Sequence, residues 1–170
     1  MKKKKYGVKE LSIFAMFIAL GLVLQYVEGF FTAIPVPGGK IGLANIVSIV
    51  NLFMFGGVNA LLITAIRAFL GALLIGGITA VPYSVSGAIV SVVLMWIVKK
   101  YFYPKVSMIG ISIAGATGHN IAQLCIASIV FSSGYIFSYL APMLVVGLLG
   151  GIVTGYAAKH FAGRYLRYRV

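Results

Sequence analysis

The side chains that could do chemistry in this chain are few, and most lie within long apolar runs. The sequence has no Asp, and its only carboxylate side chains are Glu10 and Glu28. A Mg²⁺-dependent diphosphate or nucleotide enzyme needs clustered carboxylates to hold its metal, and one pair so far apart along the chain cannot supply them. Cys125 and two His residues make a poor zinc site. The sequence therefore predicts no metal, no cofactor and no enzymatic activity.

The polar side chains inside the apolar runs point to ligand binding instead. Ionisable groups at membrane depth are costly and usually face a cavity or one another. With a rise of 1.5 Å per helical residue, their depths converge on the outer half of the expected bundle. Shared depth of this kind predicts a binding pocket that opens to the outside. The residues assigned to it are Glu28, Lys40, Asn45, Arg67, His119, Asn120 and Gln123.

The charge of this predicted pocket favours an anionic ligand. Two cations, Lys40 and Arg67, have only Glu28 as an acidic neighbour, and uncompensated positive charge suits an anion. Structural alternatives stay open for these residues. Arg67 and Glu28 could form a buried ion pair. His119 and Gln123, one helical turn apart, could hydrogen-bond neighbouring helices.

The loop at residues 35–42 has the glycines and lysine of a phosphate-binding loop but not its full pattern. A Walker A motif here requires Gly at position 34 and Ser or Thr at position 41. Those positions hold Ile34 and Ile41. We therefore expect no ATP hydrolysis by this chain.

The elements that must position these residues are membrane helices. The chain of 170 residues is 61% hydrophobic and 9% charged, with a mean hydropathy of +1.07, which excludes an ordinary soluble domain. Its Lys and Arg fall between apolar runs rather than on one solvated face, which argues against nucleic-acid binding. We predict an all-α, polytopic membrane protein with one integral membrane domain over 1–170. Its six transmembrane helices are expected at about 11–34, 41–55, 58–75, 81–98, 106–131 and 136–161.

The basic residues predict the orientation of the bundle. All but Lys40 and Arg67 fall in three groups, before the first span, between the fourth and fifth, and at the end of the sixth. Six spans place all three groups on one side, which the positive-inside rule assigns to the cytoplasm. We expect both termini to be cytoplasmic in a bacterial plasma membrane. A signal peptide is the alternative for the Lys-rich start, but the apolar stretch is too long and no cleavage site follows it.

Small residues recur at every fourth position on several spans, which permits close helix approach. For the stripes in spans three, five and six, packing within the bundle is the favoured interpretation. Ala15 and Ala19 differ because they lie near the cytoplasmic end of the first span. That position is where a partner protein could dock.

Three segments resemble a known family. Residues 40–46, with the sequence KIGLANI, are similar to a stretch typical of the Gx transporter family, also labelled heptaprenyl diphosphate synthase component I. Residues 67–71 (RAFLG) and 118–124 (GHNIAQL) are similar too, and the resemblance spans about 11–155. The resemblance implies a fold like the substrate-binding S component of energy-coupling factor (ECF) transporters.

The resemblance also implies partners and a role. S components capture a vitamin-like ligand from outside, then associate with a membrane coupling subunit and two cytoplasmic ATPases. An Ala-x-x-x-Ala motif on the first helix commonly serves that docking, and Ala15 and Ala19 match it. Two alternatives remain open. One is a non-catalytic accessory subunit of isoprenoid, heptaprenyl diphosphate or quinone synthesis, and the other is a stand-alone channel or facilitator.

Overall fold

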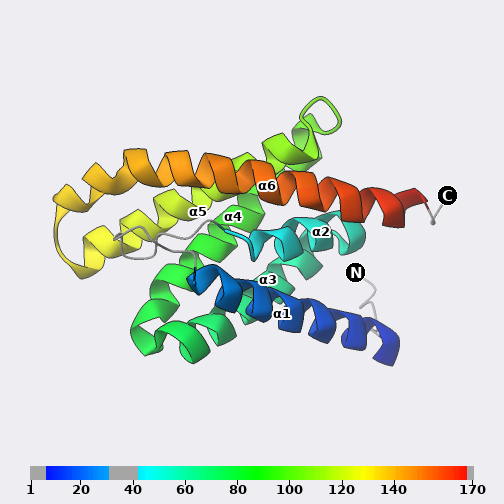
Figure 1. Ribbon diagram of the computed structural model, residues 1–170, viewed down its shortest axis with the longest axis horizontal. Coiled ribbons are helices and arrows are strands. Elements are labelled where there is room, and N and C mark those ends of the chain that lie inside the picture. The colour runs from blue at the N-terminus through cyan, green and yellow to red at the C-terminus, as the bar shows by residue number, and fades with distance from the viewer. Residues whose placement is uncertain (1–6, 31–41, 168–170) are drawn as a thin grey trace.

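The computed structural model describes residues 7–30 and 42–167, with side chains up to residue 161, and this part of the chain contains helices and no strand. Lys40 and most of the 35–42 loop lie outside the described residues. The predicted all-α membrane fold is confirmed (Figure 1). The main helices are α1 (Val8–Gly29), α2 (Asn45–Phe55), α3 (Gly57–Gly71), α4 (Val81–Phe102), α5 (Met108–Val130) and α6 (Leu140–Arg167). Short turns of π-helix, η1 (Ala72–Gly76), and 3₁₀-helix, η2 (Ile78–Ala80) and η3 (Gly134–Tyr139), extend three of them.

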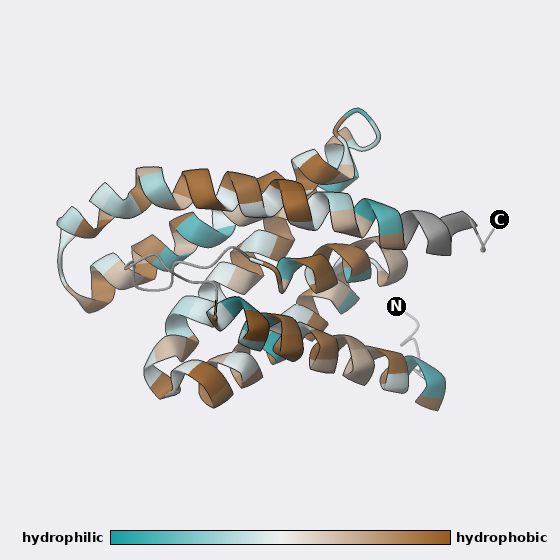
Figure 2. Cartoon of the chain, in the orientation of Figure 1, coloured by the Kyte–Doolittle hydropathy of each residue, from teal (hydrophilic) through white to brown (hydrophobic). Residues whose placement is uncertain are grey.

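Within the described part of the chain, five helical stretches are long and apolar enough to cross a membrane. They match the predicted first, third, fourth, fifth and sixth spans. The ends that can be compared differ by a few residues, and residues 31–34 of the first predicted span lie outside the described part of the chain. Apolar residues are frequent along these helices, and hydrophilic residues are visible at both ends of α1, within α5 and near the end of α6 (Figure 2). The stretches are Val8–Gly29, Gly57–Gly76, Ile78–Phe102, Met108–Val130 and Gly134–Phe161.

The second predicted span differs from the expectation. Helix α2 begins at Asn45 rather than at residue 41 and has 11 residues, which is about 16 Å of helix and roughly half of the hydrocarbon thickness. It is a central helix, packed against α3, α6, α1, α4 and α5. Its residues 47–52 are all buried, Ser48 and Asn51 among them. Because protein surrounds this helix on every side, its polar residues avoid contact with lipid.

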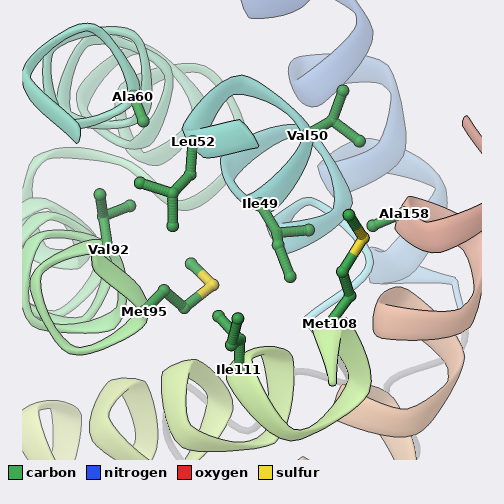
Figure 3. Packing of buried hydrophobic residues seen from close by; sticks show 9 residues of the cluster. All are labelled: Ile49, Val50, Leu52, Ala60, Val92, Met95, Met108, Ile111 and Ala158. Carbon is green, nitrogen blue, oxygen red and sulfur yellow. The ribbon is translucent and has the colours of Figure 1, made fainter. Parts of the chain in front are cut away.

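The core gathers around α2. Side chains from α2, α3, α4, α5 and α6 meet in one cluster (Figure 3). Since lipid is as apolar as these side chains, the cluster stabilises the bundle through close packing more than through removal from water. The cluster consists of Ile49, Val50, Leu52, Ala60, Val92, Met95, Met108, Ile111 and Ala158.

The small-residue stripes of α3 and α6 pack within the bundle, as predicted. Ala60, Thr64 and Ala68 on α3 are buried. On α6, a Cβ added at Gly151 would lie 2.9 Å from the Cα of Ile113, and one at Gly155 would lie 2.6 Å from the Cα of Ile109. Only glycine allows the α6 backbone to approach α5 this closely.

The helices alternate in direction along the long axis of the molecule (Figure 1). The start of α1, the α2–α3 turn, the α4–α5 turn and the end of α6 lie at the same end. Lys99 is at this end, where its Nζ donates to the Leu52 carbonyl at 2.8 Å and lies 4.2 Å from the centre of the Phe53 ring. A cation at the carboxyl end of α2 satisfies an otherwise unpaired carbonyl and complements the helix dipole.

Candidate functional site

Buried polar residues from five helices and from the segment before α2 meet around one small cavity. Its volume is about 20 Å³, which is room for about one water molecule. Of the predicted site residues, Glu28, Asn45, Arg67 and His119 come together here. The full lining is Gln25, Glu28, Gly42, Ala44, Asn45, Arg67, Ser84 and His119.

Arg67 is the cation of the cavity. Its side chain is 3% exposed, and its Nη1 donates to Oε1 of Gln25 at 3.0 Å. The guanidinium crosses from α3 to α1 at Gly21, where an added Cβ would lie 2.2 Å from Arg67 Cδ. Gln25 in turn rests on Gly71 of α3, where an added Cβ would lie 2.5 Å from Gln25 Oε1. Two glycines thus allow two long polar side chains to meet between the helices.

Glu28 supplies negative charge to the same cavity. Its side chain is 1% exposed, its Oε1 accepts the backbone N–H of Gly42, and its charge acts on Arg67. The described lining therefore holds one cation and one anion. The predicted excess of positive charge depends on Lys40, which lies outside the described residues, so it stays a prediction.

Asn45, Ser84 and His119 complete the wall from three further helices. Asn45 begins α2, where its N–H donates to the Gly42 carbonyl at 2.8 Å. Gly42 has a φ of +91°, a left-handed conformation that favours glycine. Ser84 Oγ donates to the Ala68 carbonyl at 3.2 Å and ties α4 to α3. His119 is half-buried against Gly87 of α4.

The structure places Asn120 and Gln123 elsewhere. Asn120 is 3% exposed, and its Nδ2 donates to the Met143 carbonyl of α6 at 2.6 Å. Gln123 is 2% exposed and lies beside Gly87, outside the cavity lining. Asn120 thus joins two helices. Asn120, adjacent in number to His119, points to another face of α5, which depth alone does not distinguish. Gln123 lies on the same face as His119, one turn along, and contacts the same Gly87.

Gln25 and Ser84 line the cavity although neither was assigned to the predicted site. For Gln25 a usable signal existed: it precedes Glu28 by three positions, which places both on one helix face. For Ser84 the only signal was its position at the start of a span. Gly21 and Gly71 carry no sequence signal that would separate them from other membrane glycines.

The opposite face of α1 is uncovered. The side chains of Ala15 and Ala19 are exposed, as are Met16 and Leu20 beside them. Of the five span-length helices, α1 buries the smallest share of its apolar stretch. One helix therefore carries the cavity wall on one face and the predicted docking residues on another.

One family comparison bears on this site and two others return no match. Residues 17–161 match the sequence profile of a family described as heptaprenyl diphosphate synthase component I. The match covers the cavity, the α5–α6 pair and Ala19. No curated protein and no solved structure matches the chain.

Proposed function

We propose that this chain, which belongs to the heptaprenyl diphosphate synthase component I family, is the substrate-binding subunit of an ECF-type importer. It captures a small anionic ligand, vitamin-like or isoprenoid-related, from the outer side of the membrane. The observation that carries the proposal is the buried Arg67, held by Gln25 beside a cavity lined by five helices. Ionisable residues at such depth mark ligand pathways in membrane proteins.

A non-catalytic role is part of the proposal. The family name describes a component of a diphosphate synthase, but the only two carboxylate side chains, Glu10 and Glu28, lie on α1. Glu10 accepts the Gly7 N–H at the start of the helix, and Glu28 is about 27 Å further along it at 1.5 Å per residue. A pair so separated cannot hold the Mg²⁺ of a diphosphate substrate.

The second candidate is an accessory membrane subunit of isoprenoid, heptaprenyl diphosphate or quinone synthesis. The family description favours it, since it names a component of that synthesis. Its partner would be another synthase component. The importer would instead have a membrane coupling subunit and two cytoplasmic ATPases as partners.

Extraction of the chain from native membranes in mild detergent separates the two candidates. We expect two ATPases and a coupling subunit to co-purify, together with a water-soluble anionic ligand identified by mass spectrometry. Recovery of a prenyl diphosphate synthase subunit in place of the ATPases would favour the accessory role and reject the importer.

Orientation is a separate prediction. The basic groups, Lys99 and Lys100 included, are attached to the helix ends that lie together in Figure 1, and we expect that end to be cytoplasmic. Reporter fusions at positions 38 and 170 should give opposite signals, external for the first and cytoplasmic for the second. Equal signals would mean that the chain crosses the membrane an even number of times between them, and the proposed topology would be wrong.

A further inference from the structure

In the contact between α1 and α3, each helix places a long polar side chain over a glycine of the other, which close packing of two helices does not require. Arg67 of α3 lies on Gly21 of α1, and Gln25 of α1 lies on Gly71 of α3. Both helices run in the same direction (Figure 1), so the two contacts are one turn apart. The bond from Arg67 Nη1 to Gln25 Oε1 joins them.

The chemistry of this bond fixes the orientation of both side chains. A guanidinium has only donors, so the carbonyl oxygen of Gln25 must face Arg67 and its NH₂ group must face elsewhere. Nη1 of Arg67 donates to Gln25, whereas Nε has no hydrogen-bond partner among the described residues, and Nε forms one edge of the guanidinium together with Nη2. That edge is the fork that binds two oxygens of a carboxylate or phosphate.

Donors on both residues are buried without a partner. Gln25 Nε2 and Arg67 Nε have no hydrogen-bond partner among the described residues, and the two side chains are 4% and 3% exposed. Buried polar groups in proteins are nearly always paired. The Gln25 amide and the Arg67 guanidinium therefore each have an unpaired N–H donor at the same place. A group with several acceptor oxygens would satisfy both donors.

The cavity beside these donors is too small for such a group. A volume of about 20 Å³ holds about one water molecule. Of the helices that line the cavity, α1 is the least held by its neighbours. It packs chiefly against α3 and α2, and of the span-length helices it buries the smallest share of its apolar stretch. By contrast, α5 packs along its length against both α4 and α6.

We propose that Gln25 and Arg67 together form an oxyanion receptor, and that α1 moves away from α3 to admit a carboxylate or phosphate group between them. Gln25 is then a ligand-contacting residue of the site, not only a support for Arg67. This inference rests on the proposed function for the identity of the ligand. The receptor itself can be tested on the isolated chain without any ECF partner.

The test uses inorganic phosphate and acetate as probes of the purified chain in detergent, with chloride at equal ionic strength as the reference. We expect saturable thermal stabilisation by one or both oxyanions and none by chloride. Stronger stabilisation by phosphate indicates a phosphorylated ligand, and stronger stabilisation by acetate indicates a carboxylate. No saturable stabilisation by either probe in the wild-type chain would overturn the proposal.

Variants separate a ligand contact from a structural one. Gln25→Leu should raise the apparent dissociation constant of the better probe about tenfold or more, since a hydrogen bond to a charged group is lost. Asn51→Leu is the matched control, because Asn51 is a fully buried amide outside the cavity lining, and the dissociation constant of this variant should stay within about twofold of wild type. If Gln25→Leu lowers only the melting temperature without the probe and leaves the probe affinity unchanged, Gln25 is structural and the proposal fails.

A glycine pair tests the same geometry without removing a polar group. Gly71→Ala places a Cβ against the Gln25 amide and should weaken probe binding as Gln25→Leu does. Gly29→Ala, on α1 where an added Cβ would meet no described atom within 4 Å, should leave probe affinity unchanged. Equal probe affinity in both alanine variants would contradict the role given to the Gly71 contact.

For the movement itself, spin labels at Tyr26→Cys and Ile121→Cys in a Cys125→Ser background report the α1–α5 distance. Both positions are exposed. We expect the distance distribution to shift when the oxyanion is added and to stay fixed with chloride. An unchanged distribution under saturating probe would reject α1 as the moving wall.

Discussion

If the chain works in the importer proposed above, replacing Ala15 and Ala19 together by leucine should abolish ligand uptake, while the ligand affinity of the isolated chain stays within about twofold of wild type. Both alanines are exposed on α1, so a larger side chain meets no neighbour inside the described bundle. A coupling subunit that packs closely on this face would instead meet two isobutyl groups where it needs small residues. The expected defect is therefore in association, not in folding or binding.

The measurement is uptake of the identified ligand in cells or vesicles that carry the complete importer, with co-purification of the ATPases as the direct readout. Ala141→Leu is the matched control, since Ala141 is an exposed alanine on α6, away from α1. It should leave uptake and co-purification unchanged. Uptake at the wild-type rate in the Ala15→Leu, Ala19→Leu variant would remove the case for docking on α1.

The membrane helices were predictable because their signals are local. A run of about 20 apolar residues defines a span wherever it occurs, and the four-residue spacing of small residues identifies the packing faces of α3 and α6. The extent of α2 was not predictable in this way. Its sequence is apolar enough for a span, but the helix has only 11 residues and is surrounded by other helices. Hydropathy does not distinguish a segment that faces lipid from one that faces protein.

The cavity was predictable only in part, because depth in the membrane gives the height of a residue along its helix but not the direction in which its side chain points. Depth grouped Glu28, Arg67 and His119 correctly, since all three line the cavity. It could not exclude Asn120, which has the same depth but faces α6. The face that a residue presents depends on helix rotation. The polar residues of α5 are spread around the helix and form no single amphipathic stripe from which the rotation could be read.

The contacts at Gly21 and Gly71 could not be predicted from a single sequence. Gly21 and Gly71 matter because a long polar side chain from another helix passes over each of them. Nothing in the sequence near Gly21 indicates that Arg67, 46 positions later, will lie there. Pairing between distant positions is a property of the folded chain, and it is the property on which the oxyanion receptor depends.

Arg67→Gln should weaken binding of the native anionic ligand by roughly 10- to 100-fold. A charge-assisted hydrogen bond contributes about 1.5–3 kcal/mol, and each 1.4 kcal/mol is a factor of ten in affinity. Arg67→Lys should restore little of this, because an ammonium group cannot present the planar fork. The measurement is the dissociation constant of the ligand recovered from native membranes, determined by calorimetry on the folded variants.

A purely structural Arg67 predicts a different pattern. Glu28 acts electrostatically on Arg67 across the cavity, so Arg67→Gln alone leaves a buried carboxylate without its cation and should lower the thermal stability. Adding Glu28→Gln removes that uncompensated charge and should recover much of the loss. The double variant therefore separates folding from binding. If it folds and binds the ligand as tightly as wild type, Arg67 has no part in the pocket. If it folds and still binds 10- to 100-fold more weakly than the Glu28→Gln single variant, the loss belongs to the contact between Arg67 and the ligand, because stability has been restored while the guanidinium fork has not.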